Sequence, residues 1–212
     1  ALAEDGNAAF ERTLHVFDVA DAFQVNYRRP LGARFTADHD WEGENRRSGA
    51  RIQYYVHPDS AESYGTDDLR WAVLDAQGDT VRNGGMDAEA GLQSMWWRFD
   101  ANGIPWPGRD IRKKQKFPSG GGPEAMPGEY RIALKMGDHS SSVSFDVLPD
   151  PRVPFDASAH KQRDMHRRMV MKEVEPIVDA MDQIQRALAT IDVVKQEMKW
   201  LPDSLKEEAM TL

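Results

Sequence analysis

One short segment of the sequence gathers residues that could do chemistry. In RFTADHDWEGEN, Asp38, His39, Asp40, Glu42 and Glu44 surround Trp41. Carboxylate oxygens bind calcium, and paired carboxylates act as acid and base in glycoside hydrolysis. The spacing matches neither an EF-hand loop nor a zinc signature, and an acidic loop in an acidic protein is commonly just solvated. We therefore assign no catalytic residue and no metal ligand here.

A second segment, GLQSMWWRFDANGIPWPG, contains three of the six tryptophans. Alternation along a strand places Trp97 toward the core and Trp96 on the opposite face, while Trp106 lies in a Pro-Trp-Pro loop. In one interpretation these rings fill the core and seal a loop, because large aromatic side chains are usually buried. In the other, Trp96, Trp106 and Trp41 form an exposed platform that stacks on a sugar or peptide.

The remaining polar clusters carry less information. GRDIRKKQK is the basic cluster of the chain and is interpreted as a solvated loop, with an anion or partner contact as the alternative. His160 and His166 lie six residues apart, which is not a metal-binding spacing on one helix face. Neither a Gly-x-Ser-x-Gly elbow nor a His-Glu-x-x-His helix occurs. We expect no cofactor and no catalysis by these 212 residues.

Composition excludes several classes of protein. The net charge of −8 and the pI near 5.3 argue against nucleic acid as the main partner. No apolar window approaches the length of a membrane span, and no basic-then-apolar leader opens the chain, so we expect a soluble chain. The absence of cysteine excludes disulfides and thiolate zinc sites. Because the chain begins at Ala1, we expect a processed protein or a piece of a longer one.

The elements that position these residues fall into two regions. Up to about residue 149 the apolar residues alternate in short runs separated by turn residues, which predicts antiparallel strands. The clearest hairpin is GEYRIALKMGDHSSSVSFDVL, with a turn at Gly137 and Asp138. Six to eight short strands predict an immunoglobulin-like antiparallel β-sandwich over residues 1–149. Residues 150–212 form a C-terminal helical segment, either one long amphipathic helix or a helical hairpin.

The helical segment has one apolar side. Its apolar residues recur at intervals of four and three, and we call them the apolar seam: Val170, Val174, Ile177, Met181, Ile184, Leu188, Ile191 and Met198. Asp156 or Ser158 is the expected N-cap, and Pro176 is expected to kink or interrupt the helix. WLPDSLKEEAM predicts a second helix capped by Asp203 or Ser204. Such a seam needs a partner.

The strands resemble a known family when they are taken together. GENRRSGARIQYYV, LRWAVLDAQGDTVRN, GLQSMWWRFD, MPGEYRIALKMGD and FDVLPDPRV occur in the order found in the C-terminal region of bacterial sortilin-like β-propeller proteins. These proteins are commonly described as glycosyl hydrolases with BNR (bacterial neuraminidase) repeats. The resemblance covers roughly residues 48–200. Its motifs mark strands and turns of an immunoglobulin-like module, similar to that of the flagellar hook-capping protein.

The resemblance implies an accessory role rather than an enzyme. It carries Trp97 and Tyr130 onto structural positions, while Trp96 stands where the family usually has an aliphatic residue. The propeller, where any hydrolase chemistry would be expected, lies outside this chain. The resemblance therefore implies a non-catalytic C-terminal module of a larger exported bacterial protein, which is periplasmic, outer-membrane associated or extracellular.

The expected partners follow from the seam and the tryptophans. The first hypothesis is docking on the protein's own β-propeller, on another protein surface, or on a second copy through the helical segment. The alternative is a carbohydrate-binding accessory module that uses Trp96, Trp106 and Trp41. A hydrolase that uses the acidic residues 38–44 is the third hypothesis.

Overall fold

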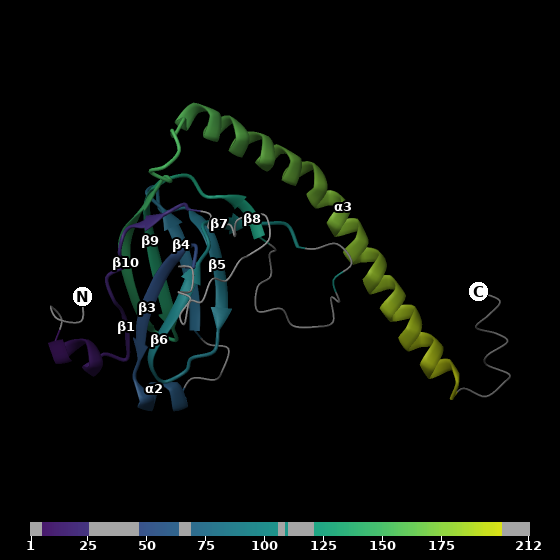
Figure 1. Ribbon diagram of the computed structural model, residues 1–212. Coiled ribbons are helices and arrows are strands. Elements are labelled where there is room, and N and C mark those ends of the chain that lie inside the picture. The colour runs from purple at the N-terminus through teal and green to yellow at the C-terminus, as the bar shows by residue number, and fades with distance from the viewer. Residues whose placement is uncertain (1–5, 26–46, 64–68, 106–108, 110–120, 201–212) are drawn as a thin grey trace, which may run out of the picture.

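The chain is mainly β, with one long C-terminal helix, in a computed structural model that describes residues 6–25, 47–63, 69–105, 109 and 121–200 (Figure 1). This confirms the prediction of a β-rich region followed by a helix. The helix, α3, starts beside one end of the sheets, and its C-terminal end lies away from them (Figure 1).

The described residues contain ten strands, more than the six to eight predicted, and four of them have four residues or fewer. Their bounds are β1 Leu14–Val16, β2 Ala22–Phe23, β3 Ala50–Val56, β4 Leu69–Asp75, β5 Thr80–Met86, β6 Gly91–Trp97, β7 Asp100–Asn102, β8 Gly121–Glu124, β9 Gly128–Met136 and β10 His139–Leu148. The helices are the 3-10 helix η1 Gly6–Glu11, α2 Pro58–Ser63 and α3 Ala157–Met198.

The strands form three sheets in the described part of the chain. The largest has the order β2-β10-β9-β4-β5, the second β1-β3-β6, and the third pairs β7 with β8. The predicted hairpin is confirmed as β9 and β10, with Tyr130 opposite Phe145 and Ile132 opposite Val143. Gly137 in its turn has φ 56°, a left-handed conformation that glycine adopts without strain.

One hydrophobic core contains residues of both larger sheets. Alternate residues of β3, β4 and β9 are buried, as period two requires, and they belong to one hydrophobic cluster with β1, β6 and β10. The central members are fully buried: Ile52, Val56, Leu69, Val73, Ile132, Leu134 and Met136. Burial of these side chains is the main stabilising term for the β region.

Trp97 lies at the centre of an aromatic cluster. Its side chain is 1% exposed, and its ring lies 5.0 Å from that of Tyr130, 5.5 Å from Phe99 and 6.1 Å from Phe145. Its indole N–H donates to the carbonyl of Asp100 at 2.9 Å, so the one polar atom of the ring is satisfied. The prediction that Trp97 belongs to the core is confirmed.

The helix α3 is a single element of 42 residues. Asp156 caps it, as predicted, by accepting from the backbone N–H groups of Ser158 and Ala159 at 2.9 and 3.1 Å. The helix continues through Pro176, so an interruption there is wrong, and the alternative of a kink stays a prediction. Proline removes one backbone donor, and the remaining hydrogen bonds of so long a helix continue on both sides. The second helix expected after Trp200 lies outside the described residues.

Replacing each of the two adjacent tryptophans by alanine tests the core. We expect Trp97→Ala to lower the free energy of unfolding by about 3–5 kcal/mol, because it leaves a large cavity. The matched control, Trp96→Ala, loses mainly cation–π contacts and should cost about 1 kcal/mol. Urea unfolding followed by circular dichroism measures both. Equal losses would contradict the assignment of Trp97 to the core.

Candidate functional site

The side of α3 that is shielded from water is not its most apolar side. The described helix residues that are buried or half-buried before the last turn form what we call the docked stripe: His160, Asp164, Met171, Val178, Asp182, Gln185 and Ala189. At 3.6 residues per turn this stripe lies roughly a quarter turn from the apolar seam. Val178, 2% exposed, is its apolar anchor.

Charge pairs hold the docked stripe in place. Asp182 is 8% exposed and accepts a hydrogen bond of 2.5 Å from the guanidinium of Arg109. Near the start of the helix, Arg163 lies 3.7 Å from Glu124 of β8, an exposed pair of small energetic value. The buried pair therefore matters most, since removing Arg109 would leave the Asp182 carboxylate buried without a counter-charge.

The apolar seam is consequently left open. Its residues from Val170 to Ile191 are all exposed, with Ile177, Ile184 and Leu188 between 56% and 60% exposed. Val170 and Val174 also line a pocket of about 950 Å³ between the helix and β7 and β8, together with Phe99. The seam is thus an apolar strip that no described part of the chain covers.

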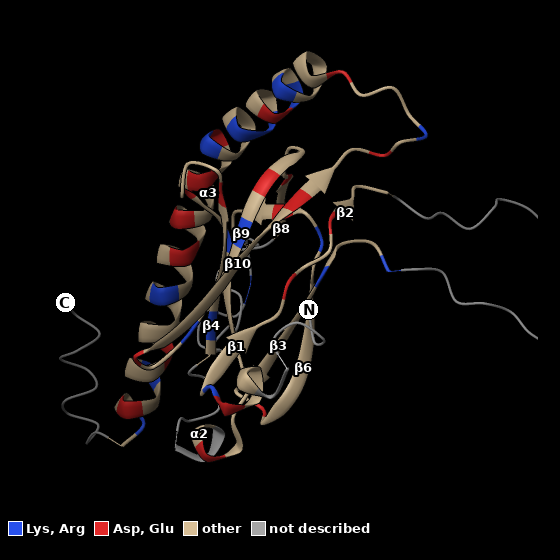
Figure 2. Ribbon diagram, turned by 90° about the vertical axis from the view of Figure 1, so that its left-hand side faces the viewer, with Lys and Arg blue, Asp and Glu red and all other residues tan. Residues whose placement is uncertain are grey.

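Charges along α3 are unevenly distributed. Up to residue 172 the helix carries one acidic residue, Asp164, and five basic ones: Lys161, Arg163, Arg167, Arg168 and Lys172. Residues 173–182 carry no basic residue and four acidic ones: Glu173, Glu175, Asp179 and Asp182. Figure 2 shows basic residues on the first part of α3 and acidic residues on its middle. Basic groups near a helix N-terminus oppose the helix dipole, so stability of the isolated helix does not explain this pattern.

Trp96 lies on the far side of β6 from the core, as predicted, but its ring is not bare. It is half-buried, and the guanidinium carbons of Arg47 and Arg51 lie 5.5 and 5.1 Å from the centre of a ring. It also lines a pocket of about 800 Å³ with polar neighbours that include Arg98 and Glu124. The sequence pattern places Trp96 outside the core, but it does not reveal the arginines.

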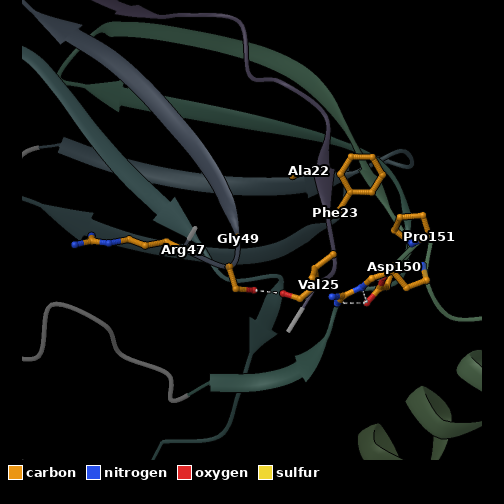
Figure 3. Close-up of a pocket in the computed structure, with 9 residues that line it drawn as sticks. Ala22, Phe23, Val25, Arg47, Gly49, Asp150 and Pro151 are labelled. Atoms are coloured by element: carbon orange, nitrogen blue, oxygen red, sulfur yellow. Dashed lines mark hydrogen bonds and ion pairs between the residues drawn. The ribbon is translucent and has the colours of Figure 1, made fainter. Parts of the chain in front are cut away.

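A smaller pocket of about 310 Å³ lies where β2, the start of β3 and the segment after β10 meet (Figure 3). Ser48 donates to the carbonyl of Val25 at 3.0 Å beside it, and Asp150 lies at its end next to Pro151. Arg152 binds Asp150 with its side chain, at 2.7 Å for Nη2, and with its backbone N–H, at 2.9 Å. These hydrogen bonds lower the pKa of Asp150 from 3.8 to about 2.

Two buried tyrosines have perturbed pKa values that point to structure rather than catalysis. Burial, with a smaller contribution from Glu89, raises the pKa of Tyr54 to about 12. Burial, together with the charge of Asp75, raises the pKa of Tyr130 to about 12. Tyr130 donates to the carbonyl of Met126 at 2.5 Å, and Tyr54 to the sulfur of Met86 at 3.1 Å. Both hydroxyls therefore stay protonated at neutral pH.

Several residues singled out in the sequence lie outside the described part of the chain. They are Trp41 and the acidic residues 38–44, Trp106, and the basic cluster except Arg109. The proposed platform of Trp96, Trp106 and Trp41 therefore stays a prediction. His160 packs on Phe155, with ring centres 4.8 Å apart, and His166 lines the pocket beneath α3.

Searches of the described residues for a metal centre and a membrane span are negative. Within these residues no group of three or more His, Asp or Glu side chains is arranged to hold a metal ion. None of the helices in the described ranges is long and apolar enough to cross a membrane.

Comparisons with known proteins give no family assignment. No protein-family model matches the chain, and a search of the curated proteins gives no match either. The resemblance to sortilin-like proteins stays a prediction.

The Asp150–Arg152 contact predicts a pH-dependent contribution to folding. Because the folded pKa lies below the unfolded value, the contribution is present above about pH 4 and is lost as the pH falls toward 2. We expect Arg152→Ala to return the pKa of Asp150 toward 3.8, as followed by carbon NMR of the carboxyl group. An unchanged pKa in Arg152→Ala would contradict the assigned cause, and Arg98→Ala serves as a control.

Proposed function

We propose that this chain is a non-catalytic interaction module and that the apolar seam of α3 docks on a protein surface. The observation that carries the proposal is the exposure of the seam from Val170 to Ile191 on a helix that is already anchored by another stripe. Monomeric proteins rarely expose contiguous apolar patches of this kind unless they bind a partner.

The anchoring explains why the seam does not turn inward. Rotating α3 to bury the seam on the β region would withdraw Val178 from its packing and separate Asp182 from Arg109. The separated carboxylate and guanidinium would lose a pairing that is worth most where it is shielded from water. The seam is thus available to a partner without any change of fold.

The proposed setting is a larger exported bacterial protein of the sortilin-like, BNR-repeat kind, in which this chain is a C-terminal accessory module. Under this proposal the β region is immunoglobulin-like. Tyr130 supports that proposal, because its hydroxyl bonds a carbonyl four residues upstream at the start of the penultimate strand, as in the tyrosine corner of such domains. Packing of Trp97 on Tyr130 is compatible with it.

Photo-cross-linking from the seam tests the docking function. We expect a benzophenone amino acid at Ile184 to give a cross-linked product in cells that make the protein, because this residue lies in the exposed seam. The matched control position is Asp179, which is also exposed but lies on the opposite side of the helix. Mass spectrometry of the linked peptides identifies the surface that is contacted. Equal or absent cross-linking at the two positions would refute docking by the seam.

A second candidate function, carbohydrate binding, has one observation in its favour. Trp96 lines a pocket of about 800 Å³ whose other walls include Gln24, Glu124 and Arg98, so an aromatic face and polar groups meet in one place. Arg47 and Arg51 beside the ring give this pocket a positive rim that suits acidic sugars. The same arginines would have to move aside for a sugar to stack on the ring.

A tryptophan-fluorescence titration tests this candidate with neutral and uronic-acid oligosaccharides. If the pocket binds sugar, Trp96→Ala abolishes a saturable signal, and the acidic ligands bind more tightly at low salt. Trp200→Ala is the control, because Trp200 is 86% exposed beyond the end of α3. A titration that shows no saturable change with either ligand class would reject carbohydrate binding at Trp96.

A further inference from the structure

We propose that the surface that covers the apolar seam is a second copy of this chain, with the two α3 helices packed antiparallel. This inference rests on the proposed docking function and names its partner. The spacing and residue types of the seam, the small residues beside it and the positions of its charged ends carry the inference.

The seam has the strict heptad spacing of a helix that packs on another helix. From Val170 to Met198 the intervals alternate between four and three, and the pattern has a single polar position, Lys195. A helix that covers a globular core usually has a wider apolar stripe, whereas this narrow seam is typical of a coiled coil. The geometry therefore favours an α-helix over a flat sheet as the partner.

The residues beside the seam determine from which side a second helix can approach. On one side lies the docked stripe, where Val178 is already buried. On the other side lie Ala180 and Ala187, which are exposed. Their small side chains allow two helix axes to come close on this side. A second helix would thus contact the seam and this alanine side.

Residue types within the seam favour the antiparallel orientation. In heptad terms Ile177, Ile184 and Ile191 occupy position d, and isoleucine at d disfavours a parallel two-stranded coil. A parallel pair would also place Arg167 and Lys195 beside their own copies. In the antiparallel pair each d residue instead packs against an a residue of the second copy.

One antiparallel register pairs the whole centre of the seam. With a two-fold axis between Asp182 and Gln183, Met181 meets Ile184 of the second copy, and Ile177 meets Leu188. The outer pairs are Val174 with Ile191 and Val170 with Lys195. At this end the lysine stem covers the valine while its ammonium group reaches water. No two like charges then face each other within the seam.

The seam supplies about half of the contact area that a stable dimer needs. From Val170 to Met198 it extends about 42 Å at 1.5 Å per residue. On a helix about 10 Å wide, the seam has a projected area of roughly 400 Å², and its protruding side chains add contact area to this. This is about half of the ~800 Å² per partner that stable interfaces bury, so the alanine side must contribute the rest of the contact.

Sedimentation equilibrium of the purified chain tests whether a second copy is the partner. We expect a monomer–dimer equilibrium, and we expect Ile184→Glu to weaken association roughly tenfold or more, because it places a charge in the seam. Asp179→Asn, on the opposite side of α3, should associate like the wild type. Circular dichroism establishes that each variant keeps its helix. A wild-type chain that stays monomeric at high concentration would overturn the proposal.

Cysteine cross-linking tests the orientation, since the chain has no cysteine of its own. An oxidised mixture of Ile177→Cys and Leu188→Cys chains should give a mixed disulfide dimer. Each variant alone should not, because identical positions in this register lie about 16 Å apart along the helix and a disulfide needs Cα atoms within ~7 Å. Cross-linking of each variant to itself would indicate parallel helices and overturn the antiparallel register.

These experiments separate the two proposals. If photo-cross-linking at Ile184 joins the chain to a different polypeptide while the purified chain is monomeric, docking by the seam holds and the second-copy proposal fails. If the Ile184 and Asp179 positions behave alike, the docking function itself fails.

Discussion

The buried contact between Asp182 and Arg109, with Val178 beside it, determines which side of α3 is exposed. A helix can place only one side against a given surface. Once the docked stripe is fixed, the apolar seam a quarter turn away must face outward. The exposure of the alanine side follows from the same placement of the docked stripe. One side of the helix is thus docked, and the other sides are exposed.

The β region supplies the rigid support for this arrangement. Its two larger sheets share one core, and the aromatic cluster around Trp97 ties β6 to β9 and β10. Glu124 of β8 contributes to the contact with α3. β8 pairs with β7, which follows Phe99 of this cluster directly in the sequence.

Predictability differed between the elements for physical reasons. Period-two alternation located the main strands, because burying one face of a sheet requires apolar residues at every second position. The turn residues located the β9–β10 hairpin. The cap at Asp156 was also predictable, because capping is local. The effect of Pro176 was not, because the cost of one lost hydrogen bond is weighed against the continuation of the whole helix.

The sequence by itself determined the alternation of the strands, the core position of Trp97, the helix and the composition of its apolar seam. Only the tertiary structure decided which helix stripe meets the β region and which remains open. Heptad spacing reveals that a seam exists, but the choice between seam and docked stripe depends on contacts between residues far apart in sequence, such as Arg109 and Asp182. The same holds for Trp96, whose arginine neighbours come from the segment leading into β3 and from β3 itself.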